Sequence, residues 1–174
     1  MAYLLDANIL IQAKNLHYGM DFCPAFWDWL VVANRAKIVY SIEKVGDELL
    51  AGDDQLAEWA KQRDGAFFLP PDDATIPALS QVADWVRKQT YRPAAVHAFL
   101  QDADYYLVAF ALAHGHTVVT HEIASDGVKR VKTPAVCIGM KVKCVNTYEM
   151  LRGERVRFVL APESWKEGPR AGGL

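Results

Sequence analysis

The sequence lacks the segments that mark membrane-spanning and secreted proteins. No stretch approaches the roughly 18 consecutive apolar residues that a transmembrane helix needs. The N-terminus shows no basic segment followed by a long apolar segment and a small-residue cleavage site. We therefore expect a cytoplasmic protein with no membrane partner. The sequence also has no GxxxxGK[ST] phosphate-binding loop, which argues against a P-loop nucleotide-binding domain.

Cysteine is sparse and net charge is low. The chain has only three cysteines among 174 residues, and Cys137 and Cys144 are too far apart for a CxxC redox or zinc pair. We expect all three to be reduced and mostly buried. The net charge of −2 argues against a protein that coats nucleic acid non-specifically. It does not exclude an enzyme whose basic residues are gathered locally.

The pattern of apolar residues predicts alternating strands and helices in one domain. A doubly wound α/β fold with a mainly parallel central sheet follows from this alternation. We assign residues 1–160 to the domain and expect the tail 161–174, rich in Pro, Gly and charge, to be partly disordered. The expected strands are 4–5, 37–40, 66–69, 117–120, 135–139, 142–146 and 157–160. The expected helices are 9–13, 24–35, a segment from 43 to about 52, 55–63, 75–90, 101–114 and 146–151.

Four acids stand in apolar surroundings, where an unpaired carboxylate is costly. Asp6 follows the first expected strand directly, and Glu122 lies two residues past the expected strand 117–120. Glu48 precedes Leu-Leu on its helix, so it should project near the buried side, and Asp104 opens the most apolar helix. Acids beyond parallel strands and on flanking helices can meet in one crevice.

Carboxylates crowded in one crevice repel each other, and a divalent cation removes that penalty. Ligation that is rich in oxygen, free of thiolate and poor in histidine selects Mg²⁺ or Mn²⁺ rather than zinc. Such sites commonly hydrolyse phosphodiesters. From these residue types we expect a site for Mg²⁺ or Mn²⁺.

Four motifs in order resemble the PIN-domain ribonucleases, including the VapC-like toxins of toxin–antitoxin pairs. They are Leu-Leu-Asp6-Ala-Asn8, Val45-Gly-Asp-Glu48-Leu-Leu-Ala-Gly52, Asp104-Tyr-Tyr-Leu-Val-Ala-Phe-Ala-Leu-Ala-His-Gly115 and Val118-Val-Thr-His-Glu122. The likeness runs from Tyr3 to about Leu160. The segment from Val131 to Asn146 looks like a PIN-like subfamily long catalogued as a domain of unknown function. The resemblance implies a three-layer α/β/α fold and a divalent-metal-dependent endoribonuclease, the toxin of a toxin–antitoxin pair.

The resemblance assigns roles to particular residues. It makes Asp6, Glu48 and Asp104 catalytic metal ligands, and it gives Glu122 the fourth position, where many relatives have aspartate. The longer Glu122 side chain leaves direct and water-mediated contact equally open. Asn8 and Thr120 would orient ligands or water around the metal.

Neighbouring acids leave some of these assignments open. Glu43 and Asp47 compete with Glu48, although only Glu48 has the following Leu-Leu-x-Gly. Asp102 competes with Asp104, which has the expected spacing to Leu-Val-Ala. Asp126 would be a fifth acid if the loop after Glu122 folds back.

A basic segment without acids follows Glu122 in the chain. Its proximity to the expected crevice predicts a contact with the RNA phosphate backbone. Its basic residues are Lys129, Arg130, Lys132, Lys141 and Lys143. Hydrolysis at such a site, by in-line attack of hydroxide, would leave a 5′-phosphate and a 3′-hydroxyl.

Other functions fit the sequence less well. A haloacid-dehalogenase-type phosphatase needs a second aspartate two residues after the first, where this chain has Asn8. His121-Glu122 is not a zinc-protease motif, because Ser125 replaces the second histidine. A catalytically inactive PIN-like module that binds RNA or an antitoxin is the alternative that remains. The resemblance implies RNA and a cognate antitoxin as partners, and also a homodimer in which tryptophans of the early helices supply the interface.

Overall fold

A five-stranded parallel sheet lies at the centre of the protein, in a computed structural model that describes residues 1–63 and 65–159. The strand order is β3-β2-β1-β4-β5. The strands are β1 (Tyr3–Leu5), β2 (Val39–Ile42), β3 (Phe68–Leu69), β4 (Thr117–Val119) and β5 (Cys144–Val145). The expected α/β class with a mainly parallel sheet is confirmed.

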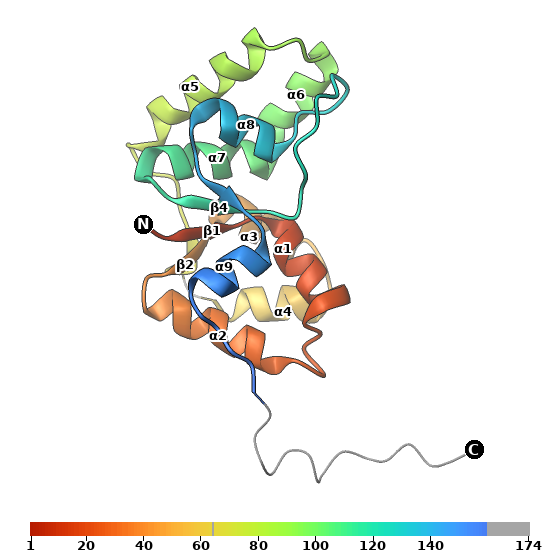
Figure 1. Cartoon of the computed structure of the whole chain (residues 1–174), viewed down its shortest axis with the longest axis vertical. Helices are drawn as coiled ribbons and strands as arrows, with labels where there is room; N and C mark the ends of the chain where they lie inside the picture. The colour runs from red at the N-terminus through yellow and green to blue at the C-terminus, as the bar shows by residue number, and fades with distance from the viewer. Residues whose placement is uncertain (64, 160–174) are drawn as a thin grey trace, which may run out of the picture.

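Helices connect the strands and cover both faces of the sheet. In Figure 1, α5 to α8 lie on one side of it, and α1, α2, α4 and α9 lie on the other. The helices are α1 (Ala7–Gln12), the π-helix η1 (Ala13–His17), α2 (Pro24–Arg35), α3 (Glu43–Leu50), α4 (Gln55–Lys61), α5 (Thr75–Lys88), α6 (Pro93–Gln101), α7 (Ala103–His114), α8 (Thr133–Met140) and α9 (Thr147–Gly153).

The central strand β1 places the first candidate acid. Tyr3 pairs with Val39 of β2 on one side and Thr117 of β4 on the other, so β1 has neighbours along both edges. Leu4 and Leu5 have no exposed surface, as expected for a parallel strand covered on both faces. Because β1 ends at Leu5, Asp6 lies at the carboxyl edge of the sheet.

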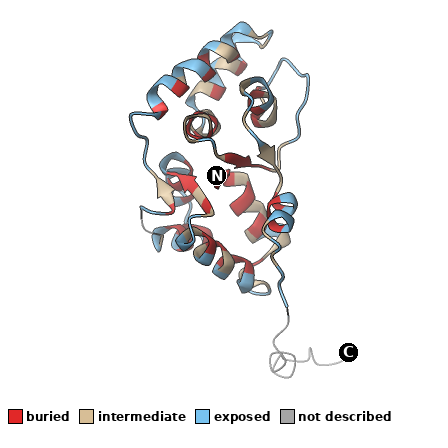
Figure 2. Cartoon of the chain, turned by 60° about the vertical axis from the view of Figure 1, so that its left-hand side comes forward, coloured by how far each residue is buried: buried red, intermediate tan, exposed pale blue. Residues whose placement is uncertain are grey.

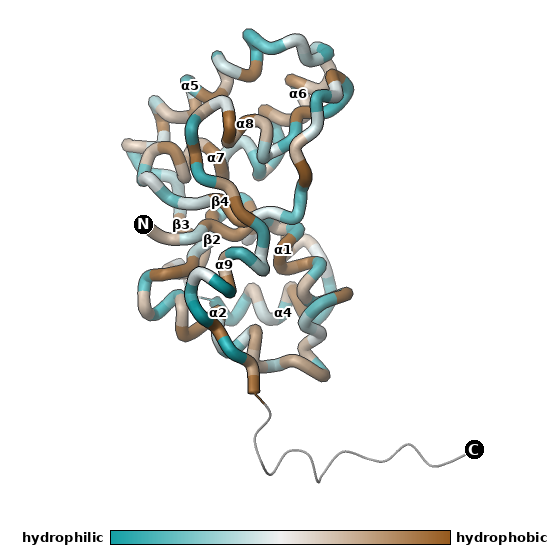
Figure 3. Tube along the Cα trace, in the orientation of Figure 1, coloured by the Kyte–Doolittle hydropathy of each residue, from teal (hydrophilic) through white to brown (hydrophobic). Residues whose placement is uncertain are grey.

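The core follows the sheet and the inner faces of its helices. Buried residues, red in Figure 2, gather on the strands and on the sides of helices that face them. Figure 3 shows hydrophobic residues where the chain crosses the centre and hydrophilic residues mainly towards the outside. No helix in the described ranges has both the length and the apolar character needed to cross a membrane.

The predicted strand 135–139 is wrong, because this segment belongs to helix α8. Val136 and Cys137 are fully buried in it, and a short apolar run of this kind does not distinguish a strand from a buried helix. Pro134 in the first helical turn and Lys141 in the left-handed conformation after the last turn set the ends of the helix.

The region before β4 holds two helices where the sequence suggested one. Asp102 is extended and separates α6 from α7, and its side chain accepts a hydrogen bond from the backbone N–H of Asp104. Helix α6 was not predicted. Gly115, with φ of 64°, ends α7 as expected.

The predicted strand 157–160 is not found over its described part, since residues 157–159 form no strand. Residue 160 and the predicted tail 161–174 lie outside the described residues. The cysteines are free thiols, with Cys137 buried and Cys23 and Cys144 half-buried.

Gly139→Ala should destabilise the protein, although alanine normally favours a helix interior by about 0.5–1 kcal/mol over glycine. A Cβ at position 139 would lie 2.0 Å from Cζ2 of Trp85 on α5, so the indole ring would have to move. We expect a loss of about 1–3 kcal/mol, measured as a melting temperature lower by about 2–4 °C for each kcal/mol. Gly127→Ala is the control, because its Cβ would lie 3.8 Å from the nearest atom, Oγ of Ser125. A higher melting temperature for Gly139→Ala would contradict this packing.

Candidate active site

Asp6 is a buried carboxylate at the carboxyl end of β1, with 3% of its surface exposed. Its Oδ2 accepts hydrogen bonds from Oγ1 of Thr120 at 2.7 Å and from Nδ2 of Asn8 at 2.5 Å. Burial raises the pKa of Asp6 to about 6, and the charges of Glu122 and Glu48 add to the rise, while the hydrogen bonds from Thr120 and Asn8 oppose it. Asp6 also begins α1, because its side chain accepts from the backbone N–H of Asn8.

Asn8 and Thr120, the residues expected to orient the site, both contact Asp6 and each other. Nδ2 of Asn8 lies 3.0 Å from Oγ1 of Thr120. The amide oxygen of Asn8 accepts from the backbone N–H of His121 at 3.0 Å, and Oγ1 of Thr120 accepts from the backbone N–H of Glu122 at 3.1 Å. This network joins the end of β1 to the end of β4.

Asp104, in the first turn of α7, is electrostatically linked to Asp6. Burial raises the pKa of Asp104 to about 7, and the charges of Asp6, Asp102 and Glu122 raise it further, against the hydrogen bond from Thr133. Oγ1 of Thr133 donates that hydrogen bond to Oδ2 of Asp104 at 2.7 Å.

Glu48 lies on α3 and faces the same group of acids. Its side chain is exposed, so it does not point to the buried side of its helix as predicted. Partial burial nevertheless raises the pKa of Glu48, and the charges of Asp102 and Asp104 raise it further.

The pKa shifts distinguish some of the competing acids from one another. Glu48, and neither Glu43 nor Asp47, is the acid of α3 whose charge raises the pKa of Asp6. Asp102 is exposed and begins α7, but its charge acts on both Glu48 and Asp104, so it belongs to the same acidic region.

Glu122 differs from the other acids because basic and backbone donors surround it. Its side chain is 9% exposed, and its Oε1 lies 2.7 Å from Nζ of Lys132 and 3.1 Å from Nη2 of Arg130. Its Oε2 accepts from the backbone N–H of Thr133 at 3.0 Å. Burial alone would raise the pKa of Glu122, but these donors and charges together lower it.

Thr133 is the site residue that sequence reasoning missed. Through its hydroxyl it contacts Asp104, and through its backbone N–H it contacts Glu122. It occupies the first position of α8, the helix that the sequence analysis assigned to a strand. The pair Thr133-Pro134 was the available signal, since proline is favoured in a first helical turn.

The donor chemistry of these acids fits a divalent cation that prefers oxygen ligands. Carboxylates whose charges raise each other's pKa are stabilised by a bound cation. Across the described residues, however, no three His, Cys, Asp or Glu side chains are grouped closely enough to hold a metal ion. Among the described residues the acids therefore influence each other's pKa values without forming a compact group of three.

The predicted RNA-binding residues divide into two groups. Lys129 and Arg130 line a cavity of about 380 Å³ together with Asp102 and Asp104, and Lys132 pairs with Glu122. Lys141 and Lys143 are exposed and precede β5, so they lie near the edge where the parallel strands begin.

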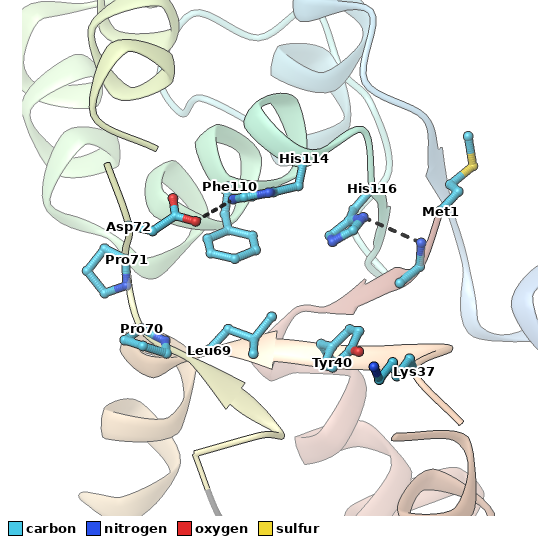
Figure 4. Close-up of a pocket in the computed structure, with 11 residues that line it drawn as sticks. Met1, Lys37, Tyr40, Leu69, Pro70, Pro71, Asp72, Phe110, His114 and His116 are labelled. Atoms are coloured by element: carbon cyan, nitrogen blue, oxygen red, sulfur yellow. Dashed lines mark hydrogen bonds and ion pairs between the residues drawn. The ribbon is translucent and has the colours of Figure 1, made fainter. Parts of the chain in front are cut away.

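A cavity of about 490 Å³ lies away from these acids (Figure 4). Its lining includes Lys37 and His116, which precede β2 and β4, and also Leu69 to Asp72, at and beyond the end of β3. In it, Nε2 of His114 pairs with Oδ2 of Asp72 at 3.0 Å, and the rings of Tyr40 and His116 stack at 6.4 Å. None of the four candidate acids lines this cavity.

The arrangement of strands and helices is that of a PIN-like fold. FitAcB from Neisseria gonorrhoeae, a crystal structure, is similar with a TM-score of 0.53 and 19% sequence identity, covering 84% of this chain and 98% of that one. The chain belongs to the family described as a domain of unknown function, DUF4411, whose model matches residues 3–158. No curated protein matches the sequence.

The opposite pKa shifts of two acids predict opposite effects of neutralising them. The pKa of Asp104 is raised when the chain folds, so between about pH 4 and 7 the native state binds more protons than the unfolded state. The free energy of unfolding therefore falls as pH rises through that range. Asp104→Asn should therefore raise the melting temperature by a few °C at pH 8 in EDTA, with the difference lost below about pH 4.

Glu122→Gln is the matched comparison, because the pKa of Glu122 is lowered on folding. The stability that its ionised form contributes is present above its unfolded pKa and lost as pH falls through the folded one. At pH 8 the melting temperature of this variant should lie below that of the native chain. In acid the two melting temperatures should become similar. Shifts of the same sign at pH 8 would refute the assigned electrostatics.

Proposed function

We propose that this protein is a divalent-metal-dependent endoribonuclease. The observation that carries the proposal is the burial of Asp6 beside Thr120 and Asn8, at the sheet edge where its charge interacts with those of Glu48, Glu122 and Asp104. An unpaired carboxylate is costly at such a place, and three more acids there raise the cost. A bound cation offsets it, and the PIN-like fold supports a nuclease.

The proposed ligands are Asp6, Glu48 and Asp104. When bound, one or two Mg²⁺ or Mn²⁺ ions supply charge neutralisation at the phosphate and a more acidic water for phosphodiester hydrolysis. Thr120 and Asn8 orient the carboxylate of Asp6, and Thr133 orients that of Asp104. These contacts fix the oxygens through neighbours that do not themselves react.

Glu122 has a different role in this proposal. Because Lys132, Arg130 and the backbone of Thr133 already occupy its oxygens, it acts on a metal through water rather than directly. It also holds the basic segment next to Asp104. Lys129 and Arg130, which share a cavity with Asp104, then contact the RNA phosphates.

The biological role follows from the resemblance to VapC-like toxins. We propose that the enzyme is the toxin of a toxin–antitoxin pair and that a cognate antitoxin covers the acidic site. Homodimerisation is the second expected assembly. The competing function is a PIN-like module that binds RNA or an antitoxin without cleaving RNA, and metal binding distinguishes the two.

Asp6→Asn should abolish RNA cleavage in Mg²⁺ or Mn²⁺, since the amide keeps the shape of the side chain and removes its charge. We expect the rate to fall by more than about 100-fold, beyond the loss caused by removing an outer partner of a metal ligand. The measurement is cleavage of a labelled single-stranded RNA with and without EDTA. Asp47→Asn, an exposed acid on α3, is the matched control and should cleave like the native chain. Wild-type cleavage by Asp6→Asn would eliminate the assignment.

Millimolar Mn²⁺ should raise the melting temperature of the native chain. Ligand binding to the folded state alone stabilises it by RT ln(1 + [L]/Kd), which corresponds to about 2–4 °C for each kcal/mol. Asp6→Asn should lose the shift and Asp47→Asn should keep it. An unchanged melting temperature for the native chain, together with intact RNA binding, would favour the inactive module.

A further inference from the structure

Three rings from separate segments meet beside the candidate active site. They belong to His17, the last residue of η1, His121, which follows β4, and Tyr148 of α9. Their centroids lie 5.5 Å apart for the two histidines, 5.9 Å for His17 and Tyr148, and 6.2 Å for His121 and Tyr148. All three pairs are tilted or edge-on, which is the usual geometry of aromatic contacts. We call these residues the ring cluster.

Hydrogen bonds hold the rings in place. The hydroxyl of Tyr148 lies 3.3 Å from Nδ1 of His17, and Oγ1 of the buried Thr147 lies 3.2 Å from Nε2 of His121. The backbone N–H of His121 donates to Asn8. The rings are thus fixed before any ligand arrives, which reduces the entropy that a ligand loses by ordering them.

The ring cluster adjoins the acidic site directly. His121 is bonded to both Thr120 and Glu122 in the chain, and its hydrogen-bond partner Asn8 itself donates to Asp6 at 2.5 Å. A single residue, Asn8, therefore links the ring cluster to Asp6 through hydrogen bonds.

The rings remain accessible to a ligand. Tyr148 is 39% exposed, and His17 and His121 are half-buried. Arg152 is exposed and lies four residues after Tyr148 on α9, a spacing that places the two side chains on the same face of the helix. Open rings beside a basic side chain are typical of surfaces that stack bases of single-stranded nucleic acid and hold its phosphates.

We propose that the ring cluster of His17, His121 and Tyr148 is a base-stacking subsite for single-stranded RNA. It takes the base of a nucleotide next to the phosphate held at the carboxylates, and it accepts any base because each presents a flat aromatic face. This inference rests on the proposed function and adds the residues that position the strand. If the ring cluster bound a protein partner instead, its binding of RNA would not depend on the bases.

The test is binding of a short fluorescein-labelled single-stranded RNA in EDTA at low salt, followed by anisotropy. A strand of equal length with abasic nucleotides is the second probe, because it keeps the phosphates and lacks the rings. His17→Ala and Tyr148→Ala should each weaken binding of the RNA by about tenfold and leave binding of the abasic strand unchanged. Tyr148→Phe keeps the ring and loses only its hydroxyl contact with His17, so it should weaken RNA binding less than Tyr148→Ala does.

Tyr40→Ala is the matched control, since Tyr40 stacks on His116 at the opposite edge of the sheet (Figure 4). It should bind both strands like the native chain, and melting curves show whether each variant is folded. The subsite is overturned if the native chain binds the abasic strand as tightly as the RNA, if it binds neither, or if the alanine variants lose both equally.

These outcomes are separate from those of the proposed function. Base-dependent binding that His17→Ala weakens, without cleavage in Mn²⁺, would leave the subsite standing and reject the endoribonuclease. Cleavage that requires Asp6, with unchanged RNA affinity in His17→Ala and Tyr148→Ala, would support the endoribonuclease and reject the subsite.

Discussion

The hydrogen bonds that Asp6 accepts from Thr120 and Asn8 organise this end of the molecule. A carboxylate with 3% exposure needs donors that replace water, since an unsatisfied buried charge is costly. Thr120 brings β4 to this position and Asn8 brings the first turn of α1. Asn8 in turn accepts from His121. One charged group therefore connects a strand, a helix and the loop that leads to Glu122.

The remaining acids show how the protein balances charge around Asp6. Asp6 and Asp104 have raised pKa values because burial and mutual repulsion both disfavour ionisation. Glu122 has a lowered pKa because the side chains of Lys132 and Arg130 and the backbone N–H of Thr133 stabilise its charge. Thr133 joins the two arrangements by contacting Asp104 and Glu122 together. The start of α8 is consequently as important to the geometry as the strand ends.

Much of this arrangement could be predicted because it depends on local pattern. The apolar residues before Asp6 and the alternation of strands with helices are visible in the sequence, and both lead to the parallel sheet. The role of Thr133 could not be predicted, because it depends on α8, whose short apolar run allows either secondary structure. The meeting of His17 with Tyr148 joins positions 131 residues apart and leaves no local signal.

The topology also affects how the site forms during synthesis. Strand β1 is made first but lies between β2 and β4, so it lacks one neighbour until the chain reaches Thr117. The bond from Thr120 to Asp6 closes a separation of 114 residues, and such distant contacts form late because loop closure costs entropy. A nascent chain that stops before β4 has Asp6 but not the partner that orients it. A chain interrupted before β4 therefore lacks an arrangement on which the proposed activity depends, so that activity would arise only after most of the domain has been made.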